Sequence, residues 1–178
     1  LRLTSRDATT IRLAASRGKA PRLGSSALGT LEATRSAWHD WVAAISYDGP
    51  RRSDVIRAAI TLKLLIFEPT GAVVAAGTTS LPEVIGGVRN WDYRYAWLRD
   101  ASFTLNSLFA LGCRREATAY ARWLGDVVAD APLPMNVLYR IDGGSGLAEA
   151  IVDNADGYRG SRPVRVGNAA ERQLQLDT

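Results

Sequence analysis

The sequence predicts a mainly α-helical fold, in which helical hairpins are joined by long loops and strands are few. Apolar residues recur at helical spacing in four segments, and glycine or proline stands at the ends of these segments. The connections between them are polar and rich in glycine, which favours loops. The chain has 178 residues, 47% of them hydrophobic, so it has the size and composition of one ordinary globular domain.

The first two helices are expected at residues 30–47 and 53–67. Gly49-Pro50 closes the first one, and Ser53 is suited to cap the N-terminus of the second. Apolar residues occupy almost every side of the second helix, which predicts that it is buried on most sides. In the first helix, the residues that recur at helical spacing are Leu31, Thr34, Trp38, Trp41, Val42 and Ile45.

Two further helices are expected in the middle of the chain. One follows Asp100 and stops at Gly112, and the other spans residues 114–129. Proline cannot continue a helix, so the prolines at 132 and 134 mark the end of the second of these.

Strands are expected only in short pieces. Residues 137–141 and 147–152 flank a glycine-rich turn, which predicts a small β-hairpin. The stretch 157–168 is polar and glycine-rich and should not be helical, whereas a last helix should start at Ala169. Residues 1–28 read as a short N-terminal strand and a linker.

Charge and cysteine content exclude several classes of protein. The net charge is +4, but the arginines are scattered rather than gathered into a basic stripe, so we expect no nucleic-acid partner. The single cysteine, Cys113, excludes an internal disulfide. No apolar run approaches the roughly 20 residues of a membrane helix, and no signal peptide opens the chain. We therefore expect no membrane partner and a cytoplasmic location.

Metal and cofactor motifs are missing from the sequence. His39 is the one histidine, and with Cys113 it does not make a metal site, which needs several ligands. The chain also carries no phosphate-binding loop, no Rossmann fingerprint and no nucleophile elbow. We expect no cofactor.

Residues 89–100 are the most informative part of the sequence. They hold four aromatic rings, three arginines and two aspartates. Flat sugar faces bind on Trp and Tyr rings, while sugar hydroxyls need partners that donate and accept hydrogen bonds, such as an Arg-Asp pair. The cluster therefore predicts a sugar site. Asp100 also has a structural alternative, because a carboxylate near a helix N-terminus is favoured by the helix dipole.

This cluster resembles the first-subsite motif of glycoside hydrolase family 15, which contains glucoamylases, glucodextranases and bacterial trehalases. The motif is Asp92-Tyr93-Arg94-Tyr95-Ala96-Trp97-Leu98-Arg99-Asp100, and the flanking segments 69–83 and 158–170 agree with the same family in the same order. The resemblance implies an (α/α)6 barrel, of which this chain would hold about the first four of twelve helices. Residues 1–28 would end a preceding β-sandwich domain and linker, and residues 29–178 would begin the catalytic domain.

The resemblance also implies roles for particular residues. Arg99 and Asp100 are similar to the pair that hydrogen-bonds the terminal glucose, and Tyr93 and Trp97 to the rings that line its subsite. Arg162, and with it Arg159 and Asn168, resembles the wall of the pocket. For Arg162 the alternative is that it only braces its loop.

The catalytic groups are expected elsewhere. Inverting glycosidases need a carboxylic acid and a carboxylate base, and the family supplies two glutamates from segments that would lie beyond Thr178. No carboxylate here stands in a matching motif. Glu149 and Asp153 lie beside a glycine turn, which predicts a solvated edge. The chain starts without a methionine and ends within what reads as a rising helix, so we expect a fragment.

The expected function is that of part of an inverting, exo-acting, glucoamylase-like α-glucoside hydrolase. Its substrate would be a maltooligosaccharide, a starch-like glucan or trehalose. A trehalase of the same family is the first alternative, because both activities need the same terminal-glucose pocket. A non-catalytic carbohydrate-binding module is the alternative from another class.

Overall fold

A computed structural model describes residues 26–131 and 133–173 of the chain. The chain divides into two compact units, with the boundary between Ala43 and Ala44. The first unit contributes helix α1 (Ala27–Ala43), and the second contains the other described helices and strands. The strand and linker expected in residues 1–28 lie almost entirely outside the described residues.

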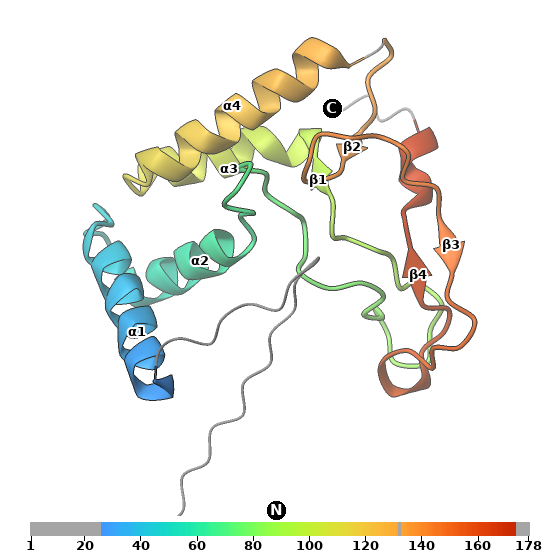
Figure 1. Cartoon of the computed structure of the whole chain (residues 1–178), viewed down its shortest axis with the longest axis horizontal. Coiled ribbons are helices and arrows are strands. Elements are labelled where there is room, and N and C mark those ends of the chain that lie inside the picture. Colours follow the sequence, from blue (N-terminus) through green and yellow to red (C-terminus); the bar gives the residue numbers. More distant parts are fainter. Residues whose placement is uncertain (1–25, 132, 174–178) are drawn as a thin grey trace, which may run out of the picture. The chain divides into compact units, whose positions relative to one another are not determined.

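The four helices expected between residues 30 and 129 are present as α-helices, which confirms the mainly α-helical fold (Figure 1). After α1 come α2 (Arg52–Leu64), α3 (Leu98–Ala110) and α4 (Arg114–Asp130). Helix α3 begins earlier than expected, so Arg99 and Asp100 lie in its first turn rather than before it. This shift matters for the site described below.

The two N-terminal helices are less buried than their apolar residues suggest. No residue of α1 is buried in the described part of the chain, although Trp38 and Trp41 meet edge to face with their centroids 5.9 Å apart. In α2 only Ala59 is buried, and Leu64 is 66% exposed. The expected burial of α2 on most sides is therefore wrong for this structure. Described residues cover it mainly on the side that carries Leu62.

Ser53 does not cap α2. Arg51 is the capping residue, in the left-handed region at φ 55°, and its carbonyl oxygen accepts the first helical hydrogen bonds from the amides of Asp54 and Val55 at 2.9 and 3.2 Å. Its guanidinium also pairs with the Asp54 carboxylate, Nε to Oδ2 at 2.8 Å. Ser53 thus falls inside the first turn, because the chain turns into the helix two residues earlier than expected.

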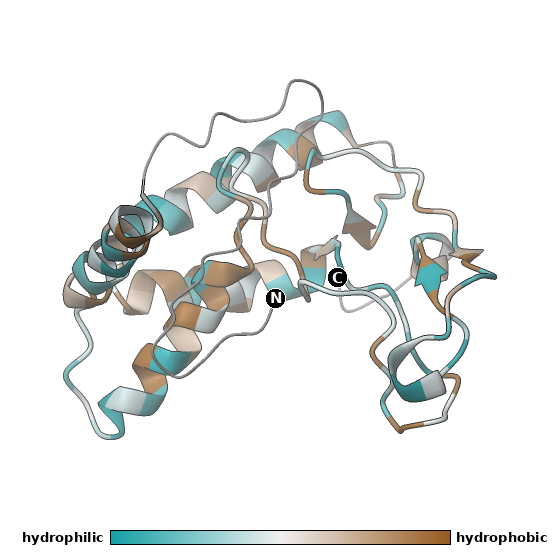
Figure 2. Ribbon diagram, turned by 60° about the horizontal axis from the view of Figure 1, so that its bottom comes forward, coloured by the Kyte–Doolittle hydropathy of each residue, from teal (hydrophilic) through white to brown (hydrophobic). Residues whose placement is uncertain are grey.

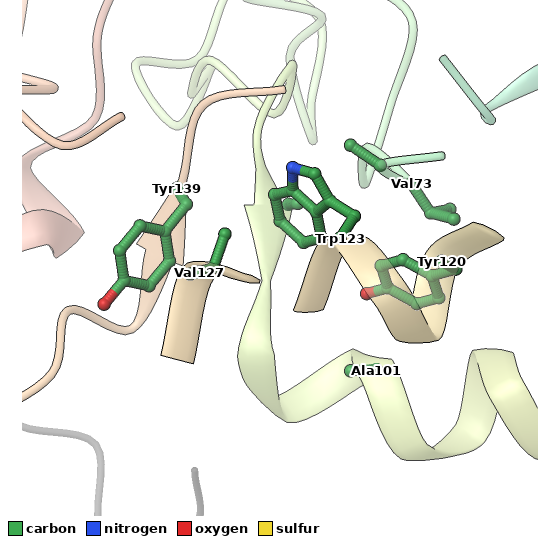
Figure 3. Packing of buried hydrophobic residues seen from close by; sticks show 8 residues of the cluster. Val73, Ala101, Tyr120, Trp123, Val127 and Tyr139 are labelled. Atoms are coloured by element: carbon green, nitrogen blue, oxygen red, sulfur yellow. The ribbon is translucent and has the colours of Figure 1, made fainter. Parts of the chain in front are cut away.

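The main core forms where α4 meets α3 and two extended segments. Figure 2 shows hydrophobic and hydrophilic residues interspersed along the helices, so each helix has apolar side chains to bury. The rings of Tyr120 and Trp123 stack at 5.8 Å in this core (Figure 3). Its buried members are Ala72, Val73, Ala96, Ala101, Tyr120, Trp123, Val127 and Tyr139.

Two short antiparallel pairs of strands complete the second unit. β1 (Ala96–Trp97) pairs with β2 (Leu138–Tyr139), and β3 (Ala150–Ile151) pairs with β4 (Arg165–Val166). Both strands expected around the glycine turn exist, but they do not pair with each other as a hairpin. All four residues of β1 and β2 are buried, so the burial of apolar side chains explains why β2 chooses β1 as its partner.

The C-terminal stretch is irregular, as its glycines suggest. It contains a short 3₁₀ turn, η1 (Tyr158–Gly160), before β4. The helix expected from Ala169 is the 3₁₀ helix η2 (Ala169–Arg172), in which the Ala170 amide donates to the Asn168 side chain. Residues 174–178 lie outside the described part. None of the described helices combines the length and apolar character needed to cross a membrane.

Candidate functional site

A cavity of about 420 Å³ opens beside the first turn of α3. Four of the five residues proposed from the sequence border it, and they come from the stretch around β1. The lining residues are Ala75, Trp91, Tyr93, Trp97, Arg99, Asp100, Glu149, Asn168, Ala169, Ala170 and Gln173. Three aromatic rings and several polar groups on one cavity form an arrangement suited to a sugar.

A larger cavity, of about 520 Å³, lies between α2 and α4. Its lining includes Lys63, Arg114, Arg122 and the carboxylate of Glu116, and none of the described residues that line it is aromatic. Lys63 already pairs with Glu116 there, with Nζ 2.8 Å from Oε1. Without a ring for a pyranose face to stack on, this cavity is the poorer candidate for a sugar.

Helix α3 positions the Arg-Asp pair. Its N-cap is Trp97, in extended conformation, so Asp100 is the third helical residue and not the cap. The Arg99 guanidinium lies close to the Asp100 carboxylate, Nε to Oδ1 at 3.4 Å, and the two side chains are 39% and 51% exposed. Both side chains border the cavity, where the guanidinium can donate to a ligand's hydroxyls and the carboxylate can accept from them.

The aromatic lining is fixed by backbone hydrogen bonds. Trp97 is held by the pairing of β1 with β2, and it is buried. The amides of Ala75 and Ala76 donate to the carbonyl oxygens of Tyr95 and Tyr93, each at 2.9 Å. The rings of Tyr93 and Trp97 meet at 5.7 Å with a tilt of 46°. The backbone bonds position the main chain that carries these two rings, and the rings contact each other on the cavity.

Asp92 anchors the aromatic cluster through its carboxylate. Its carboxylate is fully buried and accepts hydrogen bonds from Arg94 through Nε at 2.9 Å, Nη2 at 2.7 Å and the backbone amide at 3.2 Å. The Tyr95 hydroxyl and the Gly167 amide add bonds of 3.3 and 3.2 Å. Burial alone would raise the pKa of Asp92, but the hydrogen bonds and charge of Arg94 outweigh it and lower that pKa.

The same environment affects Tyr95. Burial and the negative charge of Asp92 raise the pKa of this phenol. The hydroxyl therefore stays protonated, donating to Asp92 and accepting from the Gly167 amide at 3.1 Å. In this way the glycine-rich stretch near residue 167 is tied to the aromatic cluster.

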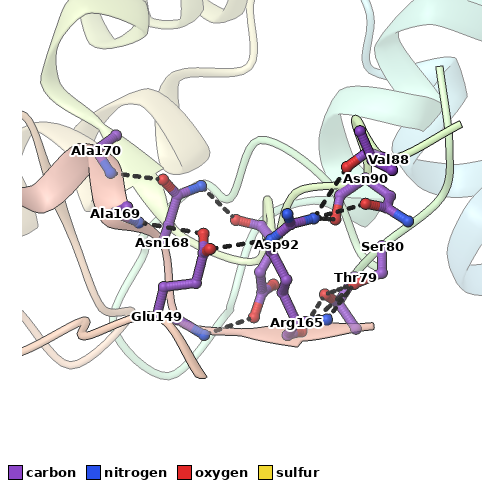
Figure 4. A network of polar contacts seen from close by, with 11 residues as sticks. Thr79, Ser80, Val88, Asn90, Asp92, Glu149, Arg165, Asn168, Ala169 and Ala170 are labelled. Carbon is purple, nitrogen blue, oxygen red and sulfur yellow. Dashed lines mark hydrogen bonds and ion pairs between the residues drawn. The ribbon is translucent and has the colours of Figure 1, made fainter. Parts of the chain in front are cut away.

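Arg165 joins the remaining wall together (Figure 4). Its Nη1 donates to the Asn90 side chain at 2.6 Å and to the Asn90 and Val88 carbonyl oxygens at 3.2 Å each. Its Nε donates to Glu149 Oε1 at 2.9 Å, and its guanidinium lies over the Trp91 ring, 4.5 Å from the centroid. One side chain thereby positions a ring and a carboxylate of the cavity.

Glu149 is the residue that sequence reasoning missed. It was expected on a solvated edge, but its side chain is only 21% exposed and faces the cavity. The pairing of β3 with β4 brings Glu149 against Arg165. The sequence contains no signal for the register of this pairing.

The residues from the glycine-rich motif divide into two groups. Asn168 borders the cavity, where its side chain donates to the Asp92 carbonyl oxygen at 2.9 Å and accepts from the Ala170 amide at 2.9 Å. Arg162 does not border it and pairs instead with Asp156. Arg159 lies over the Tyr158 ring, 5.6 Å from its centroid. The structure thus brings Tyr93, Trp97, Arg99 and Asp100 together but leaves Arg162 apart.

Metal ligands do not cluster in the described part of the chain. There, no group of three or more His, Cys, Asp or Glu side chains is arranged to hold a metal ion. The groups that line the cavity include aromatic rings, a guanidinium, carboxylates and side-chain amides.

The sequence matches the pattern of glycosyl hydrolases family 15 over residues 49–178. Among similar proteins, a protein named trehalase from Thermoplasma volcanium is 46% identical over 83% of this chain and 23% of its own length. Proteins named trehalase from Mycolicibacterium smegmatis and Mycobacterium tuberculosis are 41% and 42% identical over 99% and 88% of this chain, covering 27% and 24% of their own lengths. The chain thus spans about a quarter of the relatives it matches. No solved structure matches it. The chain belongs to glycosyl hydrolases family 15.

Proposed function

We propose that this chain forms the terminal-glucose subsite of an α-glucoside hydrolase, and that the full-length protein acts on trehalose. One observation carries the proposal: Arg99 and Asp100 share a single cavity with the rings of Trp91, Tyr93 and Trp97. Rings accept the apolar face of a pyranose, and the Arg-Asp pair offers donors and acceptors to its hydroxyls. A neutral disaccharide that ends in glucose suits this lining.

The proposed roles follow the lining. Arg99 and Asp100 bind hydroxyls of the terminal glucose, and Tyr93 and Trp97 pack against its ring. A sugar that lacks those hydroxyls leaves polar groups unpaired, at a cost of about 1 to 3 kcal/mol for each group, and this difference gives selectivity. Arg162 stays a sequence-based prediction, since it points to Asp156 instead.

Trehalose is the favoured substrate because three similar proteins, at 41% to 46% identity, are named trehalase. The glucoamylase-like activity expected first has no such support. By family resemblance, we also propose that the acid and base glutamates belong to other segments of the full-length protein, and that residues 29–178 begin the barrel that carries them.

The test is turnover of trehalose by the full-length protein, with maltooligosaccharide of equal concentration as comparison. We expect kcat/KM for trehalose to exceed that for maltotriose by at least about tenfold. Preference for maltotriose would favour the glucoamylase alternative. Glucose binding without hydrolysis of either sugar would favour the binding-module alternative.

A further inference from the structure

We propose that Glu149 is a further substrate-binding residue, whose carboxylate accepts a hydrogen bond from a hydroxyl of the bound glucoside. This inference rests on the proposed function, because it concerns the same cavity. Glu149 precedes β3 and reaches the cavity from the wall that β3 and β4 build, a wall separate in sequence from the Arg99-Asp100 pair. It would therefore bind a sugar hydroxyl that Arg99 and Asp100 do not contact.

The contacts of Glu149 leave it capacity to accept. A carboxylate offers about four acceptor positions. Among the described residues, Oε1 accepts from Arg165 Nε at 2.9 Å, and Oε2 accepts only a long bond from the Ala169 amide at 3.5 Å. A bond of that length contributes little, so Oε2 is the oxygen available to a sugar hydroxyl.

The position of the carboxylate is fixed by its neighbour. Arg165 is only 11% exposed and is held by the Asn90 side chain and by carbonyl oxygens of Asn90 and Val88. Its backbone is held as well, because the Arg165 amide donates to Ser80 Oγ at 2.7 Å and its carbonyl oxygen accepts from Thr79 Oγ1 at 2.7 Å. A carboxylate bonded to so rigid a partner is ordered before the ligand arrives, which reduces the entropy that binding must overcome.

A purely structural role for Glu149, as a counter-ion of Arg165, does not explain why its carboxylate faces the cavity. Among the described residues, the Arg165 guanidinium donates to four oxygens, and three of these belong to Asn90 and Val88. These three hold the guanidinium without any help from Glu149. A counter-ion alone would also not need to face the cavity. The geometry instead resembles that of a ligand-binding carboxylate held in place by an arginine behind it.

The experiment compares wild type with Glu149→Gln in the full-length protein, on trehalose and on its four symmetric dideoxy analogues, each of which lacks the same hydroxyl on both rings, so that neither binding orientation restores it. Glutamine keeps the size of the side chain and weakens its acceptor. We expect kcat/KM on trehalose to fall by about tenfold or more, and the loss to shrink below about threefold on the one analogue that lacks the contacted hydroxyl. An equal loss on all analogues, or a loss under threefold on trehalose, overturns the assignment.

Two controls keep the test decisive. Glu83→Gln removes a glutamate that pairs with Arg89 at 3.2 Å on an exposed loop, away from the cavity, and should leave kinetics unchanged. If Glu149→Gln fails to fold, Glu149→Asp keeps the charge for Arg165 but withdraws the carboxylate by one methylene, and the same analogue series then decides.

The outcome for Glu149 is separable from that for the proposed function. Normal trehalose turnover by wild type with no effect of Glu149→Gln overturns only the Glu149 assignment. If wild type hydrolyses no trehalose, the proposed substrate falls, and titration calorimetry with glucose decides on Glu149. At least tenfold weaker glucose binding by Glu149→Gln then supports it, and equal binding or no binding to wild type overturns it.

Discussion

Replacing Asp92 with asparagine should destabilise the protein more than its small chemical change suggests. The carboxylate is fully buried and accepts five hydrogen bonds from the described residues, three of them from Arg94. In Asp92→Asn one oxygen becomes an NH₂ group. If it takes the place of Oδ2, it faces the Arg94 and Gly167 donors, and donors cannot bond to donors.

The size of the effect follows from burial. Leaving a buried charge without its partner costs about 3 to 5 kcal/mol. Because the Arg94 side chain is 43% exposed, water takes over part of its hydrogen bonding, so this figure must be discounted. The Gly167 amide keeps its bond to the Tyr95 hydroxyl at 3.1 Å. We therefore expect a loss of about 2 to 4 kcal/mol in the free energy of unfolding at pH 7.

A matched control is available in Asp142→Asn. Asp142 also pairs with an arginine two residues away, Arg140 Nη2 to Oδ2 at 2.6 Å, and accepts from the Gly144 amide at 3.1 Å. That carboxylate is 54% exposed, so its replacement should cost less than about 1 kcal/mol. Urea denaturation of the full-length protein, followed by tryptophan fluorescence, measures both changes.

The pH dependence provides a second check on Asp92. Its pKa is lowered in the folded state, so its contribution to stability is present above the unfolded aspartate pKa of about 3.9 and is lost as pH falls through the folded value. The gap between wild type and Asp92→Asn should therefore narrow below about pH 4. A gap under 1 kcal/mol at pH 7, or one that widens in acid, would refute this reasoning.

Three further outcomes are expected. In the full-length protein, Asp100→Asn and Arg99→Lys should each lower kcat/KM on trehalose by about tenfold or more with the melting temperature preserved, and an effect under threefold would reject their role in binding. Gly167→Ala should lower the free energy of unfolding by at least about 3 kcal/mol, since φ is +84° and the new Cβ would lie 2.2 Å from the Ala148 carbonyl oxygen. The control Gly146→Ala, with φ +88° and open space around the new Cβ, should cost about 1 to 2 kcal/mol. Equal melting temperatures of the two variants would contradict this prediction. Burial, with the nearby charge of Asp100, raises the pKa of Tyr120 to about 12, so ultraviolet titration should show, besides the raised phenol of Tyr95, a late phenol that Tyr120→Phe removes. The stability that depends on Tyr120 should be lost as pH rises from about 10 through about 12.

The helices could be predicted from the sequence because their signals are local. Apolar spacing and the glycines and prolines between segments placed all four to within a few residues. The aromatic cluster was visible for the same reason, since its rings and its Arg-Asp pair are contiguous. The prediction that Ser53 caps α2 was wrong because a cap depends on backbone conformation, and an arginine gives no sign that its backbone is left-handed, as it is at Arg51.

The other features of the site and the strand pairing could not be predicted, because they depend on contacts between residues that are distant in the sequence. Glu149 and Arg165 are 16 residues apart, and Asp92 and Gly167 are 75 apart, so no periodicity links them. The pairing of β2 was missed for a related reason. A glycine turn suggests that β2 pairs with the strand after the turn. Instead β2 pairs with the buried strand β1, which begins at Ala96, 42 residues before β2 begins at Leu138.

The bonds from Arg165 to Asn90 have a consequence for how the molecule is made. Their 75-residue separation means that, on the ribosome, the loop carrying Asn90 is synthesised long before its partner. At roughly 5 to 20 residues per second, the delay is about 4 to 15 seconds. During that time Leu81, Val84, Ile85 and Val88, which are exposed in the described part of the chain, lie on a loop whose partner Arg165 has not yet been synthesised. This loop is where a chaperone would be expected to engage the nascent chain.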